Sequence, residues 1–133
     1  MLRCALVLGG TAPALAAIDL AHKASADAHD FHSRSAGYAA FVLVLSLAWS
    51  AAIVLTRSPA LALGGGVLVG GAFGNVASLA LWPGVPNPIE APPIAFNLAD
   101  VFVLTGFVLV AATTLAFVRA NRERLSQPLR LRP

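Results

Sequence analysis

Four stretches of this 133-residue chain are apolar over roughly the length of one membrane crossing. About 20 helical residues span the ~30 Å hydrocarbon core of a bilayer. Backbone groups in lipid must bond within their own segment, so such stretches form helices. We expect these helices at about residues 5–21, 38–55, 60–81 and 98–118. The sequence therefore predicts an all-α integral membrane protein, with a four-transmembrane-helix bundle in residues 1–120.

Composition and the distribution of charge agree with this prediction. Hydrophobic residues make up 58% of the chain and charged residues 11%, which excludes an ordinary soluble domain. Seven of the nine lysines and arginines fall on one side of the predicted membrane: Arg3, Arg57, Arg119, Arg122, Arg124, Arg130 and Arg132. Basic residues gather on the cytoplasmic side. We therefore expect both termini in the cytoplasm and a basic cytoplasmic tail at residues 121–133.

The net charge of +3 follows mostly from this topology. Its expected partners are anionic membrane lipids, and nucleic acid is not expected. The expected location is the inner (plasma) membrane, crossed several times. The first apolar stretch has a second interpretation, because Arg3 and the run Ala14-Leu15-Ala16 also resemble a secretory signal with its cleavage site.

Two polar or proline-rich loops are predicted on the outer side. Residues 82–93 contain five prolines and cannot lie inside a helix, so we expect a stiff cover there. Residues 22–37 carry side chains of the types that bind zinc; they are His22, His29, His32, Asp27 and Asp30. Their spacing matches no tight ligand motif, and we expect neither a metal nor a cofactor.

Small residues mark the third predicted helix. Glycines at both ends of residues 66–70 and 70–74 allow another helix backbone to approach closely. Asn75 and Ser78 follow towards the outer end, and Asn97 and Asp100 begin the fourth helix on the same side. Antiparallel neighbours joined by an outer loop would bring Ser78 and Asp100 to similar depth.

Three motifs resemble one family. The run GGAFGNVASL at residues 70–79 resembles the signature G-G-A-x-G-N-x-x-D-R of prolipoprotein signal peptidase, or signal peptidase II. The run FNLAD at residues 96–100, followed by Gly106, resembles that family's F-N-x-A-D-x-x-x-x-x-G. Asp19 and Lys23 are similar to its D-x-x-[ST]-K. Order, spacing and predicted topology agree across the four-helix plan.

The resemblance implies an intramembrane aspartyl endopeptidase that cuts signal peptides before a lipidated cysteine. One carboxylate of such a pair takes a proton from water while the other, protonated, polarises the peptide carbonyl. Asp100 matches one family aspartate, but Ser78 stands in place of the other and Leu79 in place of the following arginine. The predicted catalytic dyad is therefore incomplete.

The resemblance also implies supporting or substrate-binding roles, for Asn75, Asn97, Asp19 and Lys23. Each side chain has a structural alternative. Asparagines bond across membrane bundles, Asp19 and Lys23 have the i, i+4 spacing of a helical ion pair, and a first-turn acid such as Asp100 can bond free backbone N–H groups.

Several functional hypotheses remain open. Asp27 or Asp30 could approach Asp100 and supply the second carboxylate. A complete site would cleave lipid-modified prolipoproteins, whereas an inactive relative would bind lipidated or helical membrane clients in the same groove. A third hypothesis is a small transporter subunit, because an intramembrane acid also suits proton-coupled transport.

Overall fold

The computed structural model of this chain describes residues 1–28 and 30–125. Four of its helices are long and apolar enough to cross a membrane: α1 (Leu2–Ser25), α2 (Ala36–Leu55), α3 (Pro59–Leu81) and α4 (Leu98–Ala120). The predicted four-helix membrane architecture is confirmed. A short helix, α5 (Arg122–Leu125), follows α4. The rest of the predicted tail, residues 126–133, and His29 lie outside the described residues.

Local sequence explains where the helices begin. The hydroxyl oxygens of Ser35 and Ser58 accept hydrogen bonds from the backbone N–H groups of Tyr38 and Leu61, which caps α2 and α3. Asn97 caps α4. The largest difference from the prediction is at α1, which continues to Ser25 and so carries Lys23 on its last turn.

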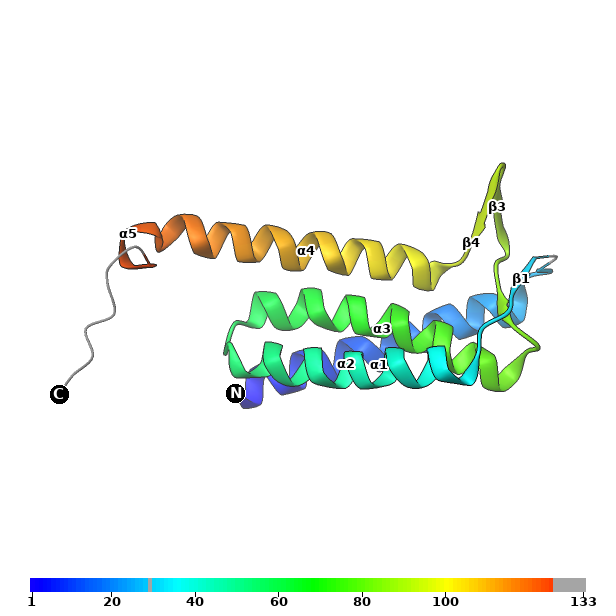
Figure 1. The fold of residues 1–133 in the computed structure, drawn as a ribbon, viewed down its shortest axis with the longest axis horizontal. Coiled ribbons are helices and arrows are strands. Elements are labelled where there is room, and N and C mark those ends of the chain that lie inside the picture. The colour runs from blue at the N-terminus through cyan, green and yellow to red at the C-terminus, as the bar shows by residue number, and fades with distance from the viewer. Residues whose placement is uncertain (29, 126–133) are drawn as a thin grey trace.

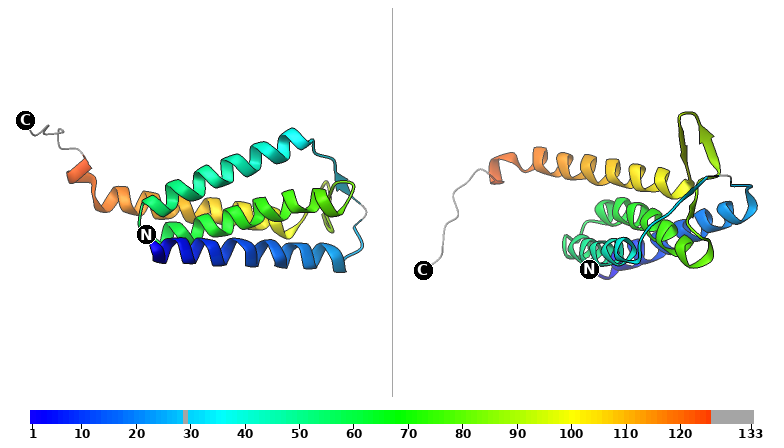
Figure 2. Two further views of the ribbon diagram at one scale, coloured as in Figure 1. Left: turned by 90° about the horizontal axis from the view of Figure 1, so that it is seen from below. Right: turned by 45° about the vertical axis from the view of Figure 1, so that its right-hand side comes forward.

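Helix α3 is the centre of the bundle. It packs most extensively against α1 and α4, and less against α2 (Figure 1). The beginning of α1, the α2–α3 connection and the end of α4 lie at one end of the bundle, and the loops and strands lie at the other, here called the loop end. Figure 2 shows α2 slanting away from α1 and α3 towards the loop end.

Glycines of α3 permit this close packing. A Cβ atom on Gly70 would lie 2.8 Å from the backbone oxygen of Ala12 in α1, and one on Gly74 would lie 2.6 Å from Oδ2 of Asp19. On the opposite side, a Cβ on Gly106 of α4 would overlap the backbone of Leu68. Side chains larger than hydrogen would separate the helices at these positions, as the small-residue pattern predicted.

Short strands join the loops, which the sequence did not indicate. Strand β1 (Phe31–His32) pairs antiparallel with β2 (Val85–Pro86), and β3 (Ile89–Ala91) forms a hairpin with β4 (Ile94–Phe96). The β1–β2 pair places His32 opposite Val85, so the loop after α1 is tied to the loop after α3. These two strand pairs fix the conformation of the proline-rich loop before α4.

The glycine contacts give a stability prediction. Gly106→Ala should lower the free energy of unfolding by about 1–3 kcal/mol, because its Cβ would push the Leu68 backbone away. Gly10→Ala is the matched control: no atom lies within 4 Å of its Cβ position, so its stability should be unchanged or higher by up to about 1 kcal/mol. Denaturant titration in micelles measures both. Equal stability of Gly106→Ala and the wild type would contradict the packing argument.

Candidate functional site

A buried ion pair connects the end of α1 to the rest of the bundle. The Lys23 Nζ atom lies 2.7 Å from Oδ2 of Asp19, and both side chains are fully buried. The other carboxylate oxygen of Asp19 accepts a hydrogen bond of 2.8 Å from the backbone N–H of Ala99 at the start of α4. The i, i+4 pair predicted from spacing is therefore present, and it also fixes the position of α4.

Lys23 makes two further contacts, both with α3. Its Nζ donates to Oδ1 of Asn75 at 2.8 Å and to Oγ of Ser78 at 3.0 Å. An ammonium group has three N–H donors and no acceptor. Together with Asp19, these acceptors match all three donors of the Lys23 ammonium group.

Ser78 is fully buried and both of its hydrogen-bonding functions are occupied. Its hydroxyl donates to the backbone oxygen of Gly74 at 2.7 Å and accepts from Lys23. Neither α3 nor α4 contains a histidine or lysine that could contact Ser78. The contact comes instead from α1, because the glycines of α3 let the two helices approach.

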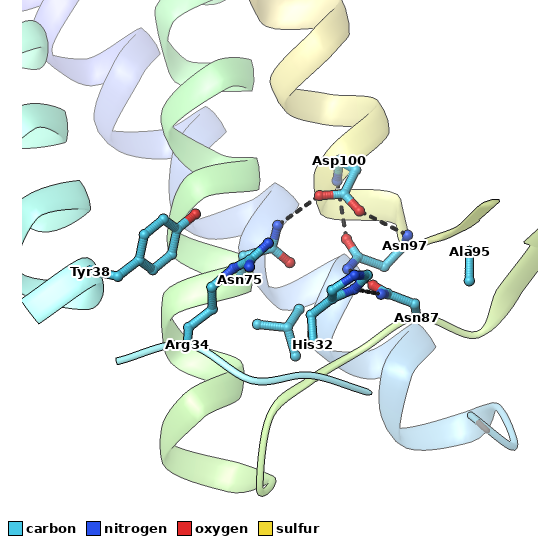
Figure 3. A pocket seen from close by; sticks show the side chains of 9 residues that line it. His32, Arg34, Tyr38, Asn75, Asn87, Ala95, Asn97 and Asp100 are labelled. Carbon is cyan, nitrogen blue, oxygen red and sulfur yellow. Dashed lines mark hydrogen bonds between the residues drawn. The ribbon is translucent and has the colours of Figure 1, made fainter. Parts of the chain in front are cut away.

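Asn75 connects this cluster to Asp100. Because Oδ1 of Asn75 faces the Lys23 ammonium, its Nδ2 faces the other way and donates to Oδ1 of Asp100 at 2.9 Å (Figure 3). Among the described residues, Lys23 and Asn75 are the side chains that link Ser78 to Asp100 by hydrogen bonds.

Asp100 and Asn97 form a reciprocal cap on α4. The Asn97 Oδ1 atom accepts from the Asp100 backbone N–H at 3.1 Å, and Oδ2 of Asp100 accepts from the Asn97 backbone N–H at 3.2 Å. This capping box provides acceptors for two backbone N–H groups that have no partner within the helix. Asp100 therefore bonds a free backbone N–H group at the start of α4, as its position in the first turn suggested, and it also contacts Asn75.

Asn97 is fully buried and also holds the loops. Its Nδ2 donates to the backbone oxygen of Pro86 at 3.2 Å and to Oδ1 of Asn87 at 2.8 Å. The Asn87 amide in turn makes a short contact with Nδ1 of His32. Asn87 is a site residue that sequence reasoning missed, because a single asparagine between two prolines carries no recognisable motif.

A polar cavity of about 130 Å³ opens beside Asp100 (Figure 3). Three helices and both loops contribute its lining: His32, Arg34, Tyr38, Asn75, Val85, Asn87, Ala95, Asn97 and Asp100. Among these described residues Asp100 carries the one carboxylate, and Ser78 is not part of the lining. Arg34 and Tyr38 are further residues that the sequence did not single out.

The acids of the loop after α1 are not part of this cavity. Oδ2 of Asp30 is 4.0 Å from Nδ1 of His32, and its backbone oxygen accepts from the Asn87 backbone N–H at 2.9 Å. Neither Asp27 nor Asp30 lines the cavity. Within residues 1–28 and 30–125, no group of three histidine, cysteine or acidic side chains could hold a metal ion.

Comparison with known proteins identifies the family. The sequence model described as Signal peptidase (SPase) II matches residues 20–116. The chain belongs to the signal peptidase II family. No curated protein and no solved structure matches it.

The family assignment confirms the resemblance seen in the motifs. The matched segment begins just after Asp19, and it contains Lys23, Asn75, Ser78 and Asp100. The buried contact between Lys23 and Ser78 therefore lies within the segment that matches the signal peptidase II family.

The Asp19–Lys23 pair gives a second stability prediction. Lys23→Met should lower the free energy of unfolding by about 3–5 kcal/mol, because it leaves the Asp19 carboxylate buried without its cation. Adding Asp19→Asn should recover part of this loss, because asparagine keeps an acceptor for the Ala99 N–H. Arg119→Met, which removes an exposed cation, should change stability by less than about 0.5 kcal/mol. A Lys23→Met protein as stable as this control would refute the prediction.

Proposed function

We propose that this signal peptidase II family protein does not cleave prolipoproteins and instead binds lipid-modified or helical membrane clients at the Asp100 cavity. The observation that carries the proposal is the environment of Ser78. Where the family motif places an acid, the chain has a fully buried hydroxyl that bonds Lys23 and the Gly74 backbone.

Aspartyl-protease chemistry needs two carboxyl groups that share the roles of base and acid. Ser78 cannot take a proton from water, since a hydroxyl becomes a base only when a neighbouring group activates it. Its neighbour, Lys23, contacts Ser78 together with Asp19 and Asn75. The same arrangement argues against a serine nucleophile, because the Ser78 hydroxyl donates to the Gly74 backbone and not to Lys23.

Asp100 remains suited to binding. Its carboxylate is exposed at the cavity, where the amides of Asn75 and Asn97 fix its position. A carboxylate held this way can accept hydrogen bonds from the backbone N–H groups of an extended client segment. The surrounding asparagines supply further polar groups for such a segment.

The same three helices offer apolar surface further along the bundle. A cavity of about 160 Å³ is lined by Trp49 and Ile53 of α2, Leu61 of α3, and Val110 and Thr114 of α4. Apolar side chains there would accommodate an acyl chain or a client helix. We place the protein in the inner membrane with both termini in the cytoplasm, as the distribution of basic residues indicates.

Cleavage assays test the proposal. Purified wild-type protein incubated with a lipid-modified prolipoprotein should release no signal peptide, and Asp100→Asn should behave in the same way. The double substitution Ser78→Asp with Leu79→Arg restores the family residues and should yield detectable cleavage, because a second carboxyl group is then present. Adding Asp100→Asn to that double variant should abolish it. Wild-type cleavage that is lost in Asp100→Asn would refute the non-cleaving role.

Binding is tested separately, with the intact prolipoprotein as the ligand. Lipid-modified substrate should co-purify with the wild-type protein and remain uncut. Substituting Asn75→Leu should weaken capture about tenfold, because it removes a cavity amide that bonds the Asp100 carboxylate. Because Asn75 also accepts from Lys23, the free energy of unfolding of this variant is measured alongside, and binding is compared at a temperature where the variant is folded. Arg119→Gln, at the far end of α4, is the matched control and should bind like the wild type. Failure of the wild type to capture the substrate would overturn client binding.

Transport by an oligomer remains a separate prediction, which flux measurements would test.

A further inference from the structure

Two opposite charges face the Asp100 cavity without pairing. Arg34 and Asp100 both line it. In the described part of the chain, no ion pair joins Arg34 to Asp100 or either of them to another side chain. The cavity therefore presents one cation and one anion to whatever occupies it.

The position of Arg34 is defined by its surroundings. It directly precedes Ser35, whose hydroxyl caps α2 by accepting from the Tyr38 backbone N–H. The Arg34 guanidinium carbon lies 5.2 Å from the centre of the Tyr38 ring, a cation–π contact. Figure 3 shows Arg34 and Tyr38 on one side of Asn75 and Asp100 on the other.

The cavity lies where the membrane helices end. Tyr38 is in the first turn of α2, Asp100 in the first turn of α4, and Asn75 near the end of α3. Helix ends with tyrosine and arginine lie at the level of lipid headgroups. A guanidinium at this level can bond the phosphate of a phospholipid headgroup through its planar N–H groups.

We propose that the cavity binds the phosphoethanolamine headgroup of a membrane phospholipid. The Arg34 guanidinium receives the phosphate, for which its planar N–H groups are suited, and the Asp100 carboxylate receives the ammonium. The polar side chains of Asn75 and Asn87 also line the cavity. This lipid goes beyond the proposed client-binding function: it is the molecule that occupies the cavity when no client is bound.

The charge pattern distinguishes this headgroup from others. Phosphoglycerol carries the phosphate without an ammonium group, so the Asp100 carboxylate would have no cationic partner and would repel it. Phosphocholine carries both charges, but its quaternary ammonium has no N–H to donate to Asp100. The Tyr38 ring, which could bind a quaternary ammonium, is already occupied by Arg34.

Native mass spectrometry of the full-length protein in detergent tests this inference, with dioleoyl phosphatidylethanolamine, phosphatidylcholine and phosphatidylglycerol as the added lipids. Phosphatidylethanolamine should bind at least about tenfold more tightly than the other two. Arg34→Gln should reduce this affinity about tenfold, the loss expected for one charged contact. Arg34 is exposed, so this variant should fold normally. Arg119→Gln, an arginine at the opposite end of the bundle, should bind like the wild type.

Equal affinity for the three lipids, or an Arg34→Gln protein that keeps the wild-type preference, would overturn the proposal. Soluble glycerophosphoethanolamine distinguishes the source of the headgroup: it should compete only at concentrations far above those of the lipid, and equal potency would exclude a membrane lipid as the ligand. The two proposals fail separately. Loss of lipid preference leaves the cleavage result untouched, and cleavage by the wild type leaves the measured lipid affinities untouched.

Discussion

The Asp19 carboxylate is the interaction on which the site depends. One oxygen binds the Lys23 ammonium, and the other accepts the Ala99 N–H at the start of α4. The carboxylate also lies against Gly74, where a Cβ atom would leave no room for it. One buried anion thus joins α1, α3 and α4, and its charge is tolerated because cation and N–H donors surround it.

The orientation of the other polar groups follows from this anion. Asp19 holds Lys23, Lys23 sets which way the Asn75 amide faces, and Asn75 then presents its NH₂ group to Asp100. Ser78 accepts the remaining Lys23 donor, so Ser78 is part of the same cluster. Binding at Asp100 and stability at Asp19 therefore cannot be changed independently.

Apolar length and motif spacing predicted much of this architecture. The four helices, the glycine contacts, the i, i+4 ion pair and the family could all be inferred, because each depends on local pattern. The Lys23–Ser78 contact, the strand pairs, and the contributions of Asn87, Arg34 and Tyr38 could not. These contacts join residues from different helices and loops. The spacing of residues within one segment does not predict which segments meet in the fold. The inner location and the orientation of the termini remain predictions from the distribution of arginines.

The capping box at the start of α4 affects how such sequences are interpreted. Asn97 and Asp100 each satisfy a backbone N–H of the other, so the helix itself benefits from both residues whether or not any peptide is cut. A chain that abandons proteolysis still has a thermodynamic reason to keep its F-N-x-A-D string. The presence of this string is therefore not by itself evidence of peptidase activity.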